Sequence, residues 1–186
     1  MTNCDNILAS RGAAYRDSQI ANHSYYNTPL QSNGVRGNSR VWGDASTNTQ
    51  RSAINAIINA GRNHGMTAEQ ITLTTAIARH ESGFNPDAAA GTTSANGIGQ
   101  FVNRTGAHYD LTDANRWDIN AQADALVRHT LDNIRLAERR GQGTEYVYAY
   151  HHDGPSLQYG GLELSRQHIM PKLEEYGQIL RDCYGL

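Results

Sequence analysis

Apolar residues recur with a helical period along most of the chain after residue 49. A first apolar stripe ends near Gly65, and a second helix is predicted to begin after Thr67, which forms a capping-box signature with Gln70. The second helix is predicted to end around Gly83. The first stripe contains Ala53, Ile54, Ile57, Ile58 and Ala60, and the second contains Ile71, Thr74, Ile77 and Ala78.

Three further helices are predicted in the second half of the chain. Asp118 can cap the third helix, in which apolar residues keep the helical period as far as Ile134. A short helix is predicted over residues 144–152, and the last helix covers roughly Ser165 to Cys183. Residues 84–106 are rich in Gly, Ala, Thr and Asn, which predicts loop and short turns. No strand pattern stands out, so the expected fold class is mostly α.

The first 48 residues differ from the rest because they are rich in Asn, Ser, Gly and Tyr and have no sustained helical period. They are predicted to form an irregular N-terminal arm (1–48) ahead of one helical domain (49–186), which suits a chain of 186 residues. The two cysteines, Cys4 and Cys183, lie near opposite ends of the chain. They are either two unpaired thiols or a bridge that joins the termini in an oxidising compartment, and the sequence leaves both readings open.

Charge and hydropathy exclude some classes of protein. The net charge of -2 and the isoelectric point of about 6.4 argue against nucleic-acid binding, which usually requires a basic patch. No run of about 18 apolar residues is present, so no membrane insertion is expected. Residues 1–18 lack the apolar core of a secretory signal peptide, which predicts synthesis in the cytoplasm and, for action outside, another route of export.

The candidate chemistry lies at the end of the second predicted helix and just after it. Glu81 comes four residues after Ile77, so the apolar stripe also aims this carboxyl group inward. Partial desolvation there raises the pKa of a carboxyl group, as a general acid at neutral pH requires. Gly97 and Gly99 are expected to let the backbone approach a ligand closely, and Gln100 offers an amide to a sugar's hydroxyl or N-acetyl group.

Three stretches within residues 50–180 resemble the motifs of the soluble lytic transglycosylases, in the family's order. Glu81-Ser82, with Phe84 and Pro86, resembles the first motif. The second motif is resembled by the stretch Ala95-x-Gly97-Ile98-Gly99-Gln100-Phe101. The third motif is resembled by Ala149-Tyr150 together with Gly154-Pro155. The resemblance implies a lysozyme-like helical fold whose cleft binds alternating N-acetylglucosamine and N-acetylmuramic acid.

The same resemblance implies a mechanism that needs one carboxylate. Glu81 would protonate the glycosidic oxygen as acid and then act as base on the muramic C6 hydroxyl, which gives a 1,6-anhydro product without water. The expected substrate contacts are Ser82, Gln100, Phe101 and Tyr150 from the motifs, Tyr109 as a further aromatic surface, and His151 as a residue that lines the cleft.

The chain departs from the family pattern in two places. Gly97-Ile98-Gly99-Gln100 stands where the family has Gly-Leu-Met-Gln, so a Met contact to the sugar is absent. The Asn of the third motif is replaced, and one residue is added before Gly154. Asp153, or Asp87 six residues after Glu81, is therefore a candidate second carboxylate, which would make the enzyme a hydrolytic muramidase. A non-catalytic peptidoglycan-binding module is the alternative from another class.

No cofactor and no metal is expected. His151, His152 and Asp153 have no spaced third and fourth ligand nearby, and position 84 is Phe where an HExxH motif needs its second His. The expected substrate is the glycan strand of peptidoglycan in the periplasm or cell wall. Stand-alone wall-lytic domains without signal peptides are typical of phage lysins and of antibacterial effectors injected by secretion machines such as type VI. The effector is slightly favoured by the arm before residue 49, and it would imply an immunity protein that plugs the cleft.

Overall fold

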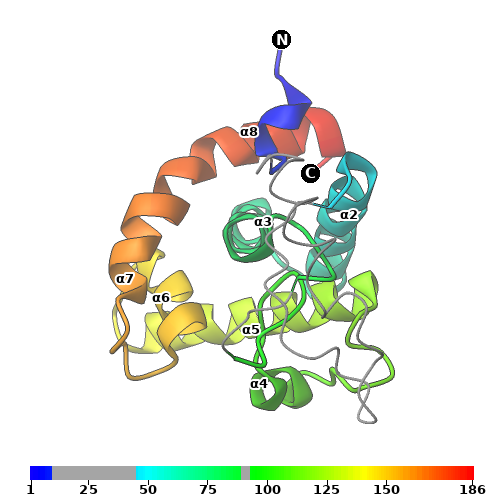
Figure 1. Ribbon diagram of the computed structural model, residues 1–186. Helices are drawn as coiled ribbons and strands as arrows, with labels where there is room; N and C mark the ends of the chain where they lie inside the picture. The colour runs from blue at the N-terminus through cyan, green and yellow to red at the C-terminus, as the bar shows by residue number, and fades with distance from the viewer. Residues whose placement is uncertain (10–44, 89–92) are drawn as a thin grey trace, which may run out of the picture.

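A computed structural model describes residues 1–9, 45–88 and 93–186, and these residues are mostly helical (Figure 1). No strand occurs in these three ranges, where the one antiparallel bridge joins Asn96 and Phe101. The expected mostly α fold is confirmed. In chain order the elements are η1 (Cys4–Ile7), α2 (Thr47–Asn63), α3 (Ala68–Ser82), α4 (Asn103–His108), α5 (Ile119–Arg139), α6 (Glu145–Asp153), α7 (Gly161–Leu164), η2 (Ser165–Ile169), η3 (Met170–Lys172) and α8 (Leu173–Tyr184).

Helix α3 is the central element of the fold. Figure 1 looks along α3, with α2, α5 and α8 arranged around it. Every residue from Ile71 to Ala78 is buried, so α3 is buried on all sides rather than on one apolar face. Its buried threonines are tolerated because their hydroxyls donate to carbonyls four residues earlier. This packing gives α3 a fixed position from which its last turn carries Glu81.

The ends of α3 and the start of α5 follow the local signals in the sequence. Thr67 and Gln70 form the predicted capping box, and Gly83 ends α3 in the left-handed conformation at φ 61°. Asp118 accepts a hydrogen bond from the backbone N–H of Ala121, which caps α5 as expected. Glu81 therefore lies in the last turn of a helix whose end is fixed.

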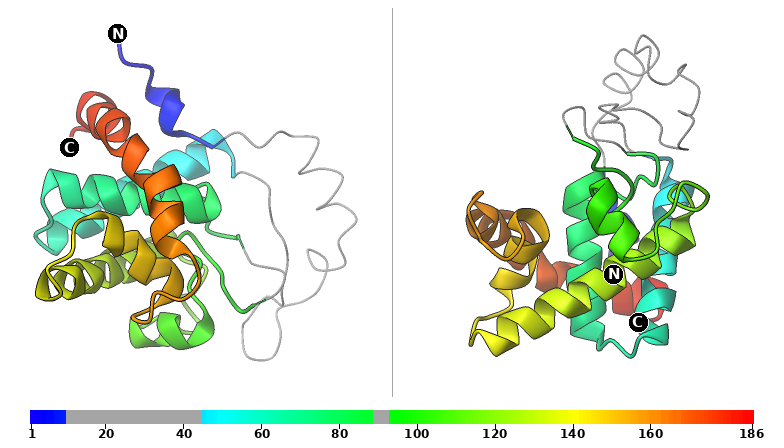
Figure 2. Two further views of the ribbon diagram at one scale, coloured as in Figure 1. Left: turned by 90° about the vertical axis from the view of Figure 1, so that its left-hand side faces the viewer. Right: turned by 90° about the horizontal axis from the view of Figure 1, so that it is seen from below.

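The prediction of one continuous helix from Ser165 to Cys183 was wrong. The stretch begins as α7 and passes through a π-helical turn in η2 and a 3-10 turn in η3 before α8 starts at Leu173. Pro171 explains the interruption, because it has no N–H to donate and its ring clashes with the carbonyl four residues earlier. The change of direction lets the stretch from α7 to α8 curve around α3 (Figure 2).

The two termini lie together, and a disulfide joins Cys4 to Cys183 with a Cα–Cα distance of 5.8 Å. The N-terminal segment runs beside the end of α8 in both figures. Ile7 is fully buried, and the Arg79 side chain of α3 donates to the carbonyls of Ile7 and Leu8. Residues 1–9 are thus part of the helical core, whereas residues 10–44 of the predicted arm lie outside the described residues. The division at residues 48 and 49 stays a prediction.

Candidate active site

Glu81 lies in the last turn of α3 with a side chain that is 16% exposed. The Tyr148 hydroxyl, from α6, donates a hydrogen bond to its Oε1 atom at 2.7 Å. Burial raises the pKa of the Glu81 carboxyl, while the Tyr148 hydrogen bond and the charge of His152 act in the opposite direction without cancelling it. The carboxyl group therefore retains its proton at a higher pH than an ordinary glutamate does.

A glycine-containing loop, residues 96–101, lies directly beside Glu81. The Ser82 hydroxyl donates to the Ile98 carbonyl at 2.9 Å, and the Ile98 N–H donates to Oε1 of Gln122 on α5 at 2.8 Å. Gly97 adopts φ 75°, and a Cβ atom there would lie 2.8 Å from the Gln122 side chain. Close packing within the protein thus explains this glycine, where the sequence suggested an approach to a ligand.

Gln122 is a site residue that the sequence did not reveal. Its Nε2 atom donates to the carbonyls of Pro86 and Arg116, in addition to the Oε1 contact with the 96–101 loop. Three loops are thereby joined to one buried side chain that is 2% exposed. An inward polar residue early in α5 was the available signal, but its partners come from distant parts of the chain.

Three of the predicted substrate contacts, Ser82, Gln100 and Phe101, make contacts within the protein that hold the 96–101 loop in place. Both hydrogens of the Gln100 amide are used, because Nε2 donates to the carbonyls of Gly97 and Ala88. Ser82 is buried and Phe101 is 5% exposed, with its ring against those of His129 and His151. These residues shape the wall beside Glu81, and we do not include them among direct sugar contacts.

His151 supports the same loop from α6. Its Nε2 atom lies 2.9 Å from the Gly99 carbonyl and 3.9 Å from Oε1 of Glu81. A carbonyl only accepts hydrogen bonds, so Nε2 carries a proton, and Nδ1 of the neutral ring is an acceptor. His129 Nδ1, at 3.2 Å, must then donate to His151 Nδ1, which leaves His129 Nε2 to accept from the Asn133 amide. The contacts thus specify opposite tautomers for the two histidines.

Burial lowers the pKa of both histidines, so the pair is neutral at neutral pH. A neutral His151 places no positive charge beside Glu81, which is what a protonated carboxyl group requires. The pair also links α5, α6 and the 96–101 loop through one chain of hydrogen bonds. We infer that it fixes the Gly99 carbonyl and preserves the uncharged surroundings of Glu81.

The histidine pair leads to a prediction about acid stability. Because burial lowers the pKa of His129 from 6.5 to about 4, the unfolded chain binds more protons than the folded one between these values. The stabilising contribution is therefore complete above pH ~6.5 and lost as the pH falls toward 4. We expect the His129→Gln/His151→Gln double variant to show a flatter dependence of the urea midpoint on pH from 7 to 4. A profile parallel to that of the wild type would contradict the neutral pair.

The tyrosine that contacts Glu81 is Tyr148, whereas the resemblance to the third motif named Tyr150 as a substrate contact. Tyr150 is 2% exposed, and its hydroxyl donates to Gln142 and accepts from Arg140. Residues two apart lie about 200° apart around a helix, so Tyr148 faces Glu81 while Tyr150 faces the other way. The available signal was the spacing of Tyr148 from His151, three positions later on the same face.

The candidate second carboxylate Asp153 is committed to contacts within the protein. Its side chain is 1% exposed and accepts hydrogen bonds from His152 Nδ1 and from the backbone N–H groups of Tyr159 and Gly161. Burial alone would raise the pKa of Asp153, but these hydrogen bonds outweigh it and the pKa lies below its usual range. Asp153 thus fixes the loop after α6, whereas Asp87 is exposed in the loop after α3.

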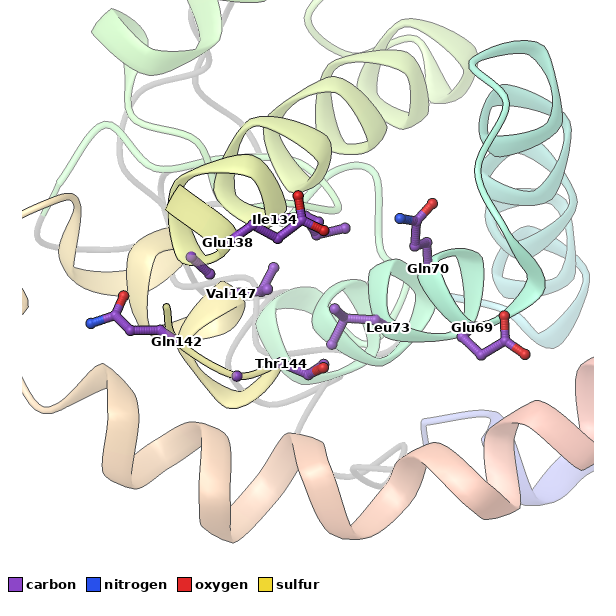
Figure 3. Close-up of a pocket in the computed structure, with 10 residues that line it drawn as sticks. Glu69, Gln70, Leu73, Ile134, Glu138, Gln142, Thr144 and Val147 are labelled. Carbon is purple, nitrogen blue, oxygen red and sulfur yellow. The ribbon is translucent and has the colours of Figure 1, made fainter. Parts of the chain in front are cut away.

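Two of the cavities in the described residues differ in their distance from Glu81. One, of about 260 Å³, lies between α3, α5 and the start of α6 and is drawn in Figure 3. It contains Glu69 and Leu73 from the beginning of α3, the opposite end from Glu81, and we assign it no role in the chemistry. The other, of about 450 Å³, is lined by Arg104, Thr105, His108, Tyr109 and His129. Tyr109 is 8% exposed there, and its hydroxyl donates to Asp132.

The described ranges contain neither a cluster of metal ligands nor a membrane-spanning helix. No group of three or more His, Cys, Asp or Glu side chains in residues 1–9, 45–88 and 93–186 could hold a metal ion. None of the helices in these ranges is long and apolar enough to cross a membrane.

Comparison with known proteins identifies the family. Residues 52–152, from α2 to α6, match the family of phage tail lysozymes. No curated protein and no solved structure matches the chain. The match confirms the lysozyme-like fold and a peptidoglycan-cleaving, lysozyme-like function. It does not identify the chain as a soluble lytic transglycosylase. Because the matched segment is more than half of the chain and contains Glu81, Tyr148 and His151, the chain belongs to the phage tail lysozyme family.

Proposed function

We propose that the protein cleaves the β-1,4 bond between N-acetylmuramic acid and N-acetylglucosamine, with Glu81 as the catalytic acid. The observation that carries this proposal is the Glu81 carboxyl itself, which is mostly buried, has a raised pKa and is oriented by Tyr148. A protonated carboxyl group of this kind can give its proton to the glycosidic oxygen as the bond to the anomeric carbon breaks.

The second step distinguishes two products. In the one-carboxylate route, the C6 hydroxyl of the muramic acid attacks the anomeric carbon, and its proton goes to the Glu81 carboxylate. The product is a 1,6-anhydro end, no water is consumed, and Glu81 is protonated again. This lytic transglycosylase outcome is supported by Asp153, because that carboxylate is enclosed by its own hydrogen bonds and is poorly placed to activate water.

The alternative is a hydrolytic muramidase with Asp87 as the second carboxylate. The exposure of Asp87 and the description of the family as lysozymes favour it. In that route Asp87 would take a proton from a water molecule that attacks the anomeric carbon, and the product would have a reducing end.

Mass spectrometry of the muropeptides released from purified peptidoglycan tests both routes. We expect anhydro-muramic ends, lighter than hydrolysed ends by one water, and little effect of Asp87→Asn or Asp153→Asn on the product. Reducing ends, together with a loss of about 10²-fold or more in Asp87→Asn, would replace the transglycosylase by the muramidase. No release from the wild type, with the disulfide either oxidised or reduced, would favour the non-catalytic binding module.

Tyr148→Phe probes the acid through the pH dependence of the reaction. Because the Tyr148 hydroxyl stabilises the ionised carboxylate, its removal raises the pKa of Glu81 further. The alkaline limb of kcat against pH, where Glu81 loses its proton, should therefore move to higher pH. Tyr159→Phe removes a hydroxyl from a tyrosine that is 70% exposed and is the matched control. An unmoved alkaline limb in Tyr148→Phe would mean that another group sets it.

The biological setting that we propose is supported by the family alone. The family description favours a phage lysin over the injected effector that the sequence suggested, and the expected site of action is the bacterial cell wall. An immunity protein belongs to the effector alternative, and we do not propose one here.

A further inference from the structure

The cavity between α4 and α5 lies next to the candidate active site. Its wall includes His129, which is hydrogen-bonded to His151, and His151 in turn lies 3.9 Å from Glu81. The hydrogen bond between the two histidines and the contact of His151 with Glu81 connect the cavity wall with the acid. A polymer that is bound across Glu81 can therefore reach the cavity with a neighbouring unit.

The cavity carries a positive charge that no acid in the described part of the chain neutralises. Arg104 is exposed, and no carboxylate in these residues pairs with it. The nearby Arg128 differs, because it pairs with Asp110 and Asp124. Asp132, whose carboxylate accepts from the hydroxyl of the lining residue Tyr109, pairs with Arg135.

The lining has the donors that an anionic ligand needs. The Arg104 guanidinium can donate two parallel hydrogen bonds to a carboxylate, while His108 and the Thr105 hydroxyl add donors on the same helix. Peptidoglycan strands offer such carboxylates at regular intervals, on the lactyl group of muramic acid and on the stem peptides. Neutral chitin-like strands do not.

We propose that this cavity is a subsite that binds a carboxylate of the glycan strand through Arg104 and so selects carboxylate-bearing peptidoglycan over neutral glycans. The proposal rests on the proposed function, because it adds a specificity subsite to the same cleft. It assigns Arg104 a role in binding and none in bond cleavage.

The test compares Arg104→Gln with Arg139→Gln on two forms of the same peptidoglycan. Arg139 is exposed in the last turn of α5, so its variant makes the same change of charge away from the cavity. One form keeps its carboxylates, and in the other they are converted to amides with a carbodiimide and methylamine. We expect Arg104→Gln to raise KM about tenfold on the native form with kcat unchanged, since charge-assisted hydrogen bonds contribute at least this much. On the amidated form it should have no effect.

Further arms identify the source of the carboxylate and separate the two proposals. Strands stripped of stem peptides keep only the lactyl carboxylate. If the Arg104→Gln effect persists on these strands, Arg104 binds the lactyl carboxylate. If the effect is lost, Arg104 binds a carboxylate of the stem peptide. Sedimentation with insoluble peptidoglycan, in a Glu81→Gln background, measures binding without turnover. Equal sedimentation of the Arg104→Gln and Arg139→Gln proteins would overturn the subsite. Absence of wild-type turnover alone would overturn only the proposed function.

Discussion

We expect Glu81→Gln to lower kcat for peptidoglycan cleavage by about 10²- to 10⁴-fold, because the amide has no proton to give to the glycosidic oxygen. The substitution is nearly isosteric, and the Gln carbonyl can still accept the hydrogen bond from Tyr148. KM should change little, since the loss concerns the transition state rather than substrate binding. Release of muropeptides from purified cell walls, followed over time, measures the effect.

The control is Glu138→Gln, the same chemical change at an exposed glutamate near the end of α5. It should leave kcat unaltered. Activity in Glu81→Gln comparable to that of Glu138→Gln would remove Glu81 from the mechanism.

Stability provides an independent readout for the same variant. The pKa of Glu81 is raised in the folded state, so the folded protein binds more protons than the unfolded chain above the ordinary value of 4.5. The contribution of Glu81 to stability is therefore complete below that pH and is lost as the pH rises through the raised pKa. Glu81→Gln should unfold at a higher urea concentration than the wild type at neutral pH, and the difference should shrink toward pH 4.

Loss of the Cys4–Cys183 disulfide should have the largest effect on stability. The bridge spans 179 residues, so it restricts nearly the whole unfolded chain. In the chain-entropy model its removal lowers the free energy of unfolding by about 5 kcal/mol. The N-terminal segment should then be held against α3 and α8 by non-covalent contacts alone, such as the burial of Ile7 and the hydrogen bonds from Arg79 to the Ile7 and Leu8 carbonyls. Urea unfolding of Cys4→Ser, with near-ultraviolet circular dichroism as the signal, measures the loss.

The matched control for the bridge is the Cys4→Ser/Cys183→Ser double variant in the presence and absence of dithiothreitol. The reductant should lower the stability of the wild type to that of the double variant and leave the double variant itself unchanged. A loss below about 1 kcal/mol would show that packing at the termini, rather than the covalent link, stabilises them.

The helices could be predicted from the sequence because their signals are local. The capping box at Thr67 and Gln70, the cap at Asp118 and the apolar periodicity each depend on residues within a turn or two. Glu81 could be found in the same way, since its distance from Ile77 places it on the inward face of one helix. Pro171 was also visible, but how a chain continues past a proline depends on what the next turn packs against.

The surroundings of Glu81 depended on the tertiary structure. Tyr148 rather than Tyr150 reaches the carboxyl because the rotation of α6 about its axis is set by packing, and a shift of two residues reverses the direction of a side chain. The His129–His151 pair and the three contacts of Gln122 join groups that are far apart in the chain. The sequence by itself determined the helices, the inward carboxyl group and the mostly α class. Only the fold decided which neighbours orient that carboxyl and which acids are already committed, because hydrogen bonds depend on distance and angle in space rather than on order along the chain.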